Sequence, residues 1–188
     1  MSQTKNSCRK KIKTVNKFNQ MDYKITIFQN IRDTSTPFFR DVSVVLQRIK
    51  DGKAKDLIEN IRKEKDKEKR NILKKGLPAV CFSGEFNKRE DSSITNHSGL
   101  ICLDFDGYST AKDLSAERKK LQKDPFTFAL FTSPSGNGLK VLVKIPKEID
   151  NHKSYFNALE KHYNSQYFDK TCKNISRVCY ESYDPKYM

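Results

Sequence analysis

Two carboxylates spaced one residue apart follow an apolar run in the middle of the chain. The run 100–103 leads directly into Asp104 and Asp106. Residues i and i+2 of a strand share a face, so the pattern predicts a buried strand that ends with both carboxylates on one side. Such like charges repel, and a divalent cation compensates that repulsion. Taken alone, the pair is equally consistent with aspartates that only cap the following turn.

A polar loop between two apolar runs offers the parts of a phosphate-binding turn. Residues 126–131 and 140–145 are predicted strands, and the short connection between them predicts a hairpin. Hydroxyls, glycines that let the backbone approach a ligand, and a cation occur together in this loop. These residues are Ser133, Ser135, Gly136, Gly138 and Lys140. The same stretch is also compatible with an ordinary hairpin turn.

Two further charged residues lie near the end of the chain. Asp169 directly follows two aromatic residues, and its simplest role is that of a turn residue. Arg177 begins the otherwise apolar run 177–180, a predicted strand, where a charge without a partner is unusual. Both are candidates to join Asp104 and the hairpin loop at one end of a sheet.

The remaining pattern predicts strands and amphipathic helices that position these residues. Strands are predicted at 24–30 and 79–83, and helices at 41–50, from about 54 to 74 with a possible restart, at 113–122 and at 150–163. Residues 87–98 are polar and predict a loop. The charged run 62–70 is typical of a solvated helical face, and no function is assigned to it.

Composition and charge bound the class of protein. The chain has 188 residues, 37 basic and 23 acidic residues and a net charge of +14, which favours a polyanionic partner, nucleic acid before membrane. Residues 1–20 carry basic but no acidic residues and predict a flexible basic arm. No apolar run approaches the length of a membrane span. We therefore expect a cytoplasmic protein, in a bacterial cell or a phage-infected host, without a membrane partner.

The cysteines indicate reduced thiols rather than a disulfide framework. Their number is odd, no pair has zinc-finger spacing, and three lie in apolar runs. The five are Cys8, Cys81, Cys102, Cys172 and Cys179. A structural zinc site is not expected.

The order of these motifs resembles the archaeo-eukaryotic primase (prim-pol) superfamily. More narrowly, it resembles the VirE-type N-terminal domain of phage, plasmid and mobile-element replication proteins. The resemblance spans roughly residues 77–185, and less firmly the region from 41. It rests on the acid pair, the Ser-Pro-Ser-Gly-x-Gly-x-Lys hairpin, and the later Asp, Ser-Arg and Ser-Tyr-Asp-Pro stretches; residues 77–86 and 96–100 also fit.

The resemblance implies an α+β fold with a mainly antiparallel or mixed central sheet flanked by helices. An RRM-like primase-polymerase catalytic core at about 77–185 would follow a helical extension at about 41–75. Residues 21–188 would then form a single domain after the basic arm.

The resemblance also implies metal-dependent nucleotidyl transfer by a two-metal mechanism. Asp104, Asp106 and Asp169 would be the catalytic carboxylates and would bind two Mg²⁺ or Mn²⁺ ions. Ser135 and Lys140 match the family's second motif, where the best-known primases carry a histidine in place of the lysine.

The nucleotide would be held by these loop residues together with Ser133, Gly136, Gly138 and Arg177. The implied partners are a single-stranded DNA template and primer, NTP or dNTP, and a helicase domain or protein. Both ribo- and deoxynucleotides stay compatible with these residues.

Two other readings use the same residues. The stretch 103–107 with Thr110 also resembles the first motif of haloacid-dehalogenase-type phosphatases, in which the first Asp is a nucleophile. That fold needs a parallel sheet, which the predicted hairpin does not favour. A non-catalytic module that binds nucleotides or single strands is the other alternative, and aromatic residues such as Phe38, Phe39, Phe86 and Tyr108 would suit it. In such a module the three carboxylates would be dispensable.

Overall fold

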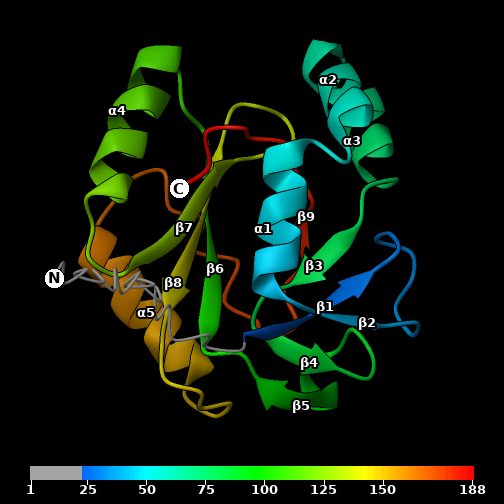
Figure 1. The fold of residues 1–188 in the computed structure, drawn as a ribbon. Coiled ribbons are helices and arrows are strands. Elements are labelled where there is room, and N and C mark those ends of the chain that lie inside the picture. Colours follow the sequence, from blue (N-terminus) through cyan, green and yellow to red (C-terminus); the bar gives the residue numbers. More distant parts are fainter. Residues whose placement is uncertain (1–22) are drawn as a thin grey trace, which may run out of the picture.

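The protein is described by a computed structural model in which residues 23–188 are placed, so the predicted arm at 1–20 lies outside the described residues. The described chain folds into antiparallel sheets and helices arranged as two neighbouring parts (Figure 1). All strand pairings within residues 23–188 are antiparallel. The predicted α+β class is confirmed, but the strands belong to three sheets rather than one central sheet.

The first sheet has the strand order β2-β1-β3-β9. Its strands are β2 (Phe38–Asp41), β1 (Lys24–Phe28), β3 (Ala79–Cys81) and β9 (Cys179–Tyr180). Strand β1 supplies buried apolar side chains, and β3 is buried throughout. The short β9 therefore brings the end of the chain beside an interior strand.

Three helices follow the first hairpin. Helix α1 (Val42–Asp51) buries residues at the predicted i, i+3, i+4 and i+7 positions, and it ends at Gly52 in the left-handed region with φ 72°. The charged run after it does not form one continuous helix. Helix α2 (Lys55–Lys63) ends before Glu64, and α3 (Lys67–Lys74) restarts because the Asp66 carboxylate accepts hydrogen bonds from two main-chain N–H groups of its first turn.

A second sheet has the order β6-β8-β7 and carries the predicted hairpin. Its strands are β6 (Leu100–Phe105), β7 (Thr127–Thr132) and β8 (Leu139–Lys144), and β7 pairs with β8 as expected. Helices α4 (Ala111–Gln122) and α5 (His152–Tyr163) cover one face of this sheet (Figure 1). Alternate residues of β6 face either these helices or the first sheet.

The edge of β6 that β8 does not use is bordered by residues 167–169. Phe105 and Phe168 form an isolated antiparallel bridge. The Asp106 N–H donates to the Tyr167 carbonyl at 2.9 Å, and the Asp169 N–H donates to the Asp104 carbonyl at 2.9 Å. Residues 167–169 therefore extend the β6-β8-β7 sheet by one short strand-like segment.

The hydrophobic core between the two larger sheets holds them together. The non-helical face of the β6-β8-β7 sheet packs against α1 and the first sheet, through a cluster that includes Ile25, Ile49, Phe82, Leu100 and Phe131. Burial of apolar side chains in such a cluster is the main contribution to the stability of a domain. One end of the space between the sheets stays open, and β6, β8 and β9 all reach it.

Strand β5 corrects the sequence-based prediction of a loop at 87–98. It spans Ile94–His97 and pairs with β4 (Gly84–Phe86). Three of its four residues are polar and its two central residues are exposed, so no apolar alternation marks it. Main-chain pairing holds it instead, and a Cβ at Gly84 would lie 2.1 Å from the Asn96 carbonyl oxygen. Within residues 23–188, no helix is long and apolar enough to cross a membrane.

Candidate functional site

Asp104 and Lys140 form the centre of the site. They lie directly opposite each other in the β6-β8 ladder, and the Lys140 ammonium donates to Asp104 Oδ2. The Lys140 side chain is only 15% exposed and that of Asp104 19%, so solvent screens this pair weakly. Burial alone would lower the pKa of Lys140, but the neighbouring Cys179 and Asp104 outweigh it and raise that pKa. Lys140 is therefore a permanent cation on the floor of the site.

Asp106 lies at the exit of β6, just beyond this ion pair. Burial raises the pKa of its carboxyl, and the negative charges of Asp104 and Asp169 raise it further. Lys140 and Lys74 act in the opposite direction. Asp106 thus experiences the carboxylate repulsion that the spacing of the acid pair predicts.

Asp169 lies beside Asp104 rather than elsewhere on the surface. A carboxylate oxygen of Asp104, one of Asp169 and the Cys172 Sγ all lie within 4.8 Å of one another. Hydrogen bonds from Cys172 and Thr171 outweigh the burial of Asp169 and lower its pKa. The structure therefore brings the first and third predicted carboxylates together, although Asp106 does not belong to this close group in the described chain.

Arg177 adds a second cation next to these acids. Its Nη2 donates to the Cys172 Sγ at 2.9 Å and lies 3.8 Å from Asp169 Oδ2. Burial raises the pKa of the Cys172 thiol to about 12, and its hydrogen bond to Asp169 adds to that effect. Cys172 is therefore a neutral donor at pH 7, which leaves carboxylate oxygens as the charged ligands of the group.

The donor set suits a hard divalent cation. Carboxylate oxygens are the ligands that Mg²⁺ and Mn²⁺ prefer, whereas a protonated thiol is a poor ligand for either. Asp104 and Asp169 already lie close enough to share an ion, and Asp106 adds a third carboxylate nearby. Asp104, Asp106 and Asp169 are thus the residues that could hold metal.

A cavity of about 520 Å³ opens over this floor between the two sheets. The predicted site residues that line it are Asp104, Asp106, Ser133, Ser135, Lys140 and Arg177. Three predicted residues do not line it in the described structure: Gly136, Gly138 and Asp169. Asp169 instead lines an adjacent hollow that it shares with Asp106.

The two loop glycines shape the hairpin. Gly136 has φ 81°, in the left-handed region, and lies against the Arg62 side chain. A Cβ on Gly138 would lie 3.0 Å from the Phe105 carbonyl oxygen and 3.3 Å from the Asp106 Cβ. Gly138 thus lets the loop pack closely against the end of β6.

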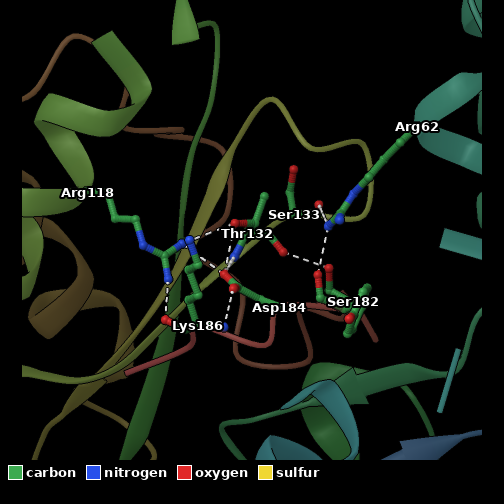
Figure 2. Close-up of polar contacts among 8 residues, drawn as sticks. Arg62, Arg118, Thr132, Ser133, Ser182, Asp184 and Lys186 are labelled. Atoms are coloured by element: carbon green, nitrogen blue, oxygen red, sulfur yellow. Dashed lines mark hydrogen bonds and ion pairs between the residues drawn. The ribbon is translucent and has the colours of Figure 1, made fainter. Parts of the chain in front are cut away.

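A buried carboxylate anchors the base of this loop. Asp184 Oδ2 accepts hydrogen bonds from the Thr132 N–H at 2.8 Å, the Thr132 hydroxyl at 2.9 Å and Arg118 Nη1 at 2.8 Å (Figure 2). The Ser182 hydroxyl donates to the Thr132 carbonyl at 2.6 Å. The Ser-Tyr-Asp-Pro stretch, noted in the sequence without a role, therefore fixes the point at which the loop leaves β7.

Arg62 joins the helical region to the same loop. Its Nη2 donates to the Ser133 carbonyl at 3.3 Å and to the Tyr183 carbonyl at 2.8 Å (Figure 2). Neither Arg62 nor Arg118 stood out in the sequence, because each lies in a helix rich in similar charges. Their roles depend on contacts between distant segments.

The charged run 62–70 is largely exposed, as predicted, but one side of α3 also borders the cavity. Lys67, Arg70, Asn71 and Lys74 line the cavity together with the predicted residues. The three cations recur at i, i+3 and i+7, which places them on one side of a helix. This spacing could have indicated a basic side of the helix. Because charged residues also occur on the other sides, the sequence does not show which side faces the protein.

A search against family models assigns the chain. The model described as "BT4734-like, N-terminal domain" matches residues 72–188, which is more than half of the chain. The protein belongs to the BT4734-like N-terminal domain family. Searches of curated proteins and of solved structures gave no match. The BT4734-like region contains the three carboxylates, the hairpin loop, Arg177 and Lys74, whereas Lys67, Arg70 and Asn71 precede it.

Proposed function

We propose that this BT4734-like domain is a metal-dependent nucleotidyltransferase of the primase-polymerase type. The observation that carries the proposal is the position of Asp169 beside Asp104, which lines a cavity together with Lys140 and Arg177. Carboxylates that bind divalent cations and cations that bind phosphate are the two requirements of nucleotidyl transfer. Their occurrence at one site supports this reaction class.

The chain order around the site supports an RRM-like core. Strand β6, helix α4, strands β7 and β8 and helix α5 follow one another, and residues 167–169 then return along the free edge of β6. An RRM-like βαββαβ unit has the same sequence of elements, with its first strand between the third and the fourth. The two acid-bearing segments would then be neighbours, with β6 in the interior of the sheet and 167–169 at its edge, and both carry their carboxylates at the same end.

The residues would divide the work as follows. Asp104, Asp106 and Asp169 would hold two Mg²⁺ or Mn²⁺ ions, which would stabilise negative charge on the attacking and leaving oxygens. Lys140 and Arg177 would bind phosphate oxygens, and the hydroxyls of Ser133 and Ser135 would donate hydrogen bonds to them. The hairpin would keep these groups in place through the Asp184 anchor at its base.

The proposed substrates are a single-stranded DNA template, a primer and a nucleoside or deoxynucleoside triphosphate. The net charge of +14 supports a polyanionic strand as partner. Replication in the cytoplasm of a bacterial cell or a phage-infected host, with a helicase domain or protein, is the proposed setting.

Template-directed incorporation of labelled nucleotide tests the proposal. Wild-type protein is incubated with Mg²⁺ or Mn²⁺, with primed and unprimed single strands, and with either nucleotide type. We expect incorporation that Asp104→Asn with Asp106→Asn abolishes, whereas Asp56→Asn, an exposed carboxylate on α2, leaves it unchanged. Absence of incorporation by the wild-type protein under every mixture would contradict catalysis.

A non-catalytic nucleotide-binding or strand-binding module is the second candidate. The ion pair between Lys140 and Asp104 favours it, because an acid neutralised by a lysine has less need of a metal. In this case strand binding persists and both aspartates can be replaced without loss of any function. The antiparallel β6-β8-β7 sheet does not support the phosphatase alternative, which needs parallel strands.

A further inference from the structure

We propose that α3 is a second phosphate-binding wall of the cavity and holds the polyphosphate of the nucleoside triphosphate. The ligand class rests on the proposed function, whereas the wall itself was assigned by none of the sequence motifs. Lys67, Arg70 and Lys74 supply the charge, and Asn71 supplies an amide donor. Most of α3 also precedes the region matched by the family model.

The direction of the α3 side chains is the first argument. Residues three, four and seven positions apart lie on one side of a helix, and the four lining residues at 67, 70, 71 and 74 follow this spacing. Lys69 belongs to the same helix, is exposed and does not line the cavity in the described structure. Helix α3 therefore presents a selected set of cations to the cavity, of which Arg70 and Lys74 are partly buried and Lys67 is exposed.

The charge balance is the second argument. Five basic side chains line the cavity against two carboxylates. Burial lowers the pKa of Lys74, and the charges of Arg70 and Lys140 lower it further, although Asp104 and Asp106 act in the opposite direction. Crowded cations repel one another, and an anion with several charged oxygens removes that cost. The cavity is thus prepared for a polyanion rather than for a neutral ligand.

The attachment of α3 is the third argument. Within the described chain, α3 contributes no fully buried side chain, and its apolar contact is that of the partly buried Leu73 with the small cluster around Ile58 and Ile61. Its described polar contacts are local: the Asp66 cap at its first turn and a hydrogen bond from Arg70 Nη1 to the Glu64 carbonyl at 3.2 Å. The side of α3 that faces the cavity accordingly differs from its other sides in the basic residues that it presents and not in buried apolar area.

The size and lining of the cavity favour a triphosphate over a continuous strand. Its volume of about 520 Å³ falls in the range of small-ligand sites, about 300 to 1,000 Å³. Cations of α3 line it together with Lys140 and Arg177, and the carboxylates lie among them. A metal-bound triphosphate fits both parts of this lining, because its phosphate oxygens would bind the basic side chains and its metal ion would bind the carboxylates.

Direct binding by the full chain tests the wall. Calorimetry measures the affinity for ATP with Mg²⁺, and for inorganic tripolyphosphate, in wild type and in the variants Arg70→Ala and Lys74→Ala. Each loss of a charge-assisted contact should weaken both ligands about tenfold or more. Lys69→Ala is the matched control, with the same charge change on the same helix, and should stay within about twofold of wild type. Thermal unfolding checks that every variant is folded.

The outcomes separate the wall from the catalytic proposal. Wild-type affinity in Arg70→Ala and Lys74→Ala, equal weakening by Lys69→Ala, or no ATP binding by wild type would each overturn the wall. If the α3 variants bound only a single-stranded oligonucleotide more weakly, the wall would be overturned as well, because the α3 cations would then bind the nucleic-acid strand. Selective weakening of ATP and tripolyphosphate supports the wall even if no nucleotide is incorporated. Incorporation with unaltered ATP affinity in both α3 variants supports the enzyme and not the wall.

Discussion

Lys140 and Asp104 neutralise each other across the β6-β8 ladder at the floor of the cavity. Each is therefore already paired before any ligand binds. A cation that binds Asp104 must compete with the Lys140 ammonium, and a phosphate that binds Lys140 must compete with the Asp104 carboxylate. A metal-bound phosphate satisfies both residues at once, so the pair favours simultaneous binding of metal and nucleotide.

Removal of the lysine charge should make stability depend on metal. Lys140→Met leaves Asp104 without the ammonium that pairs with it and should lower the free energy of unfolding by about 3 kcal/mol. Mn²⁺ at millimolar concentration should recover most of this loss, because it binds the folded carboxylates. Thermal unfolding with and without Mn²⁺ measures both effects. The control Lys119→Met, on the exposed surface of α4, should show neither. A Lys140→Met protein that Mn²⁺ does not stabilise would contradict a metal role for Asp104.

The buried pair His97 and His152 should make the protein sensitive to mild acid. Their rings are 3.1 Å apart between Nε2 and Nδ1, and the Gly99 N–H donates to His97 Nδ1. Burial lowers both pKa values to about 4; the charge of Lys147 adds to this effect at His97, and the neighbouring His97 ring adds to it at His152. The unfolded chain therefore binds more protons than the folded one between pH 4 and the ordinary histidine value of about 6.5.

Stability should accordingly be complete above about pH 6.5 and fall as the pH is lowered toward 4. The loss should be on the order of 2 kcal/mol for each ring. Urea unfolding at a series of pH values measures it, and His152→Gln should reduce the slope by about half. A wild-type unfolding free energy that does not change between pH 7 and pH 4.5 would contradict neutral rings.

The Asp184 anchor should be one of the costliest side chains to remove. Asp184→Ala deprives the Thr132 N–H and the Arg118 guanidinium of their shared acceptor, and we expect a loss of about 3 kcal/mol in unfolding free energy. Arg118→Ala alone should cost less, because Thr132 still satisfies the carboxylate. Urea unfolding of both single variants and the double variant should give a coupling energy of about 1–2 kcal/mol. Additive losses would show that the contact does not link them.

Alanine substitutions at two glycines with the same backbone conformation should distinguish the cost of backbone strain from the cost of displacing a neighbouring side chain. Gly136 and Gly107 have φ values of 81° and 79°, but only Gly136 has a neighbour, the Arg62 side chain at 3.4 Å. Gly107→Ala should cost about 1 kcal/mol from the backbone alone. Gly136→Ala should cost the same amount and, by displacing Arg62, weaken nucleotide binding as well. Urea unfolding and calorimetry with ATP compare them, and an unchanged ATP affinity in Gly136→Ala would exclude an effect of Arg62 on the loop.

The elements that could be predicted from the sequence are those whose buried residues form a local apolar pattern. Helix α1 and the hairpin of β7 and β8 carry continuous or periodic apolar residues, and both formed where expected. Strands β2 and β5 were missed because their side chains are largely exposed or polar, and pairing between main chains holds them. Their existence depends on a partner strand that no local window contains.

The same limit applies to the site. The acid pair and the hairpin loop are short motifs, so Asp104, Asp106, Ser133, Ser135 and Lys140 could be found from their spacing. The inward side of α3 and the contacts of Arg62 and Arg118 depend on how remote segments pack. Similar arginines and lysines surround each of them in the chain, and only their tertiary neighbours distinguish them.

The walls of the cavity come from distant parts of the described chain, from Lys67 on α3 to Tyr180 on β9. Closing such long loops is slow and costs entropy, so these contacts form late in folding. No short fragment would carry the complete site. A ligand that bridges the walls would consequently stabilise the global fold rather than one element, and protection against hydrogen exchange would spread to both sheets.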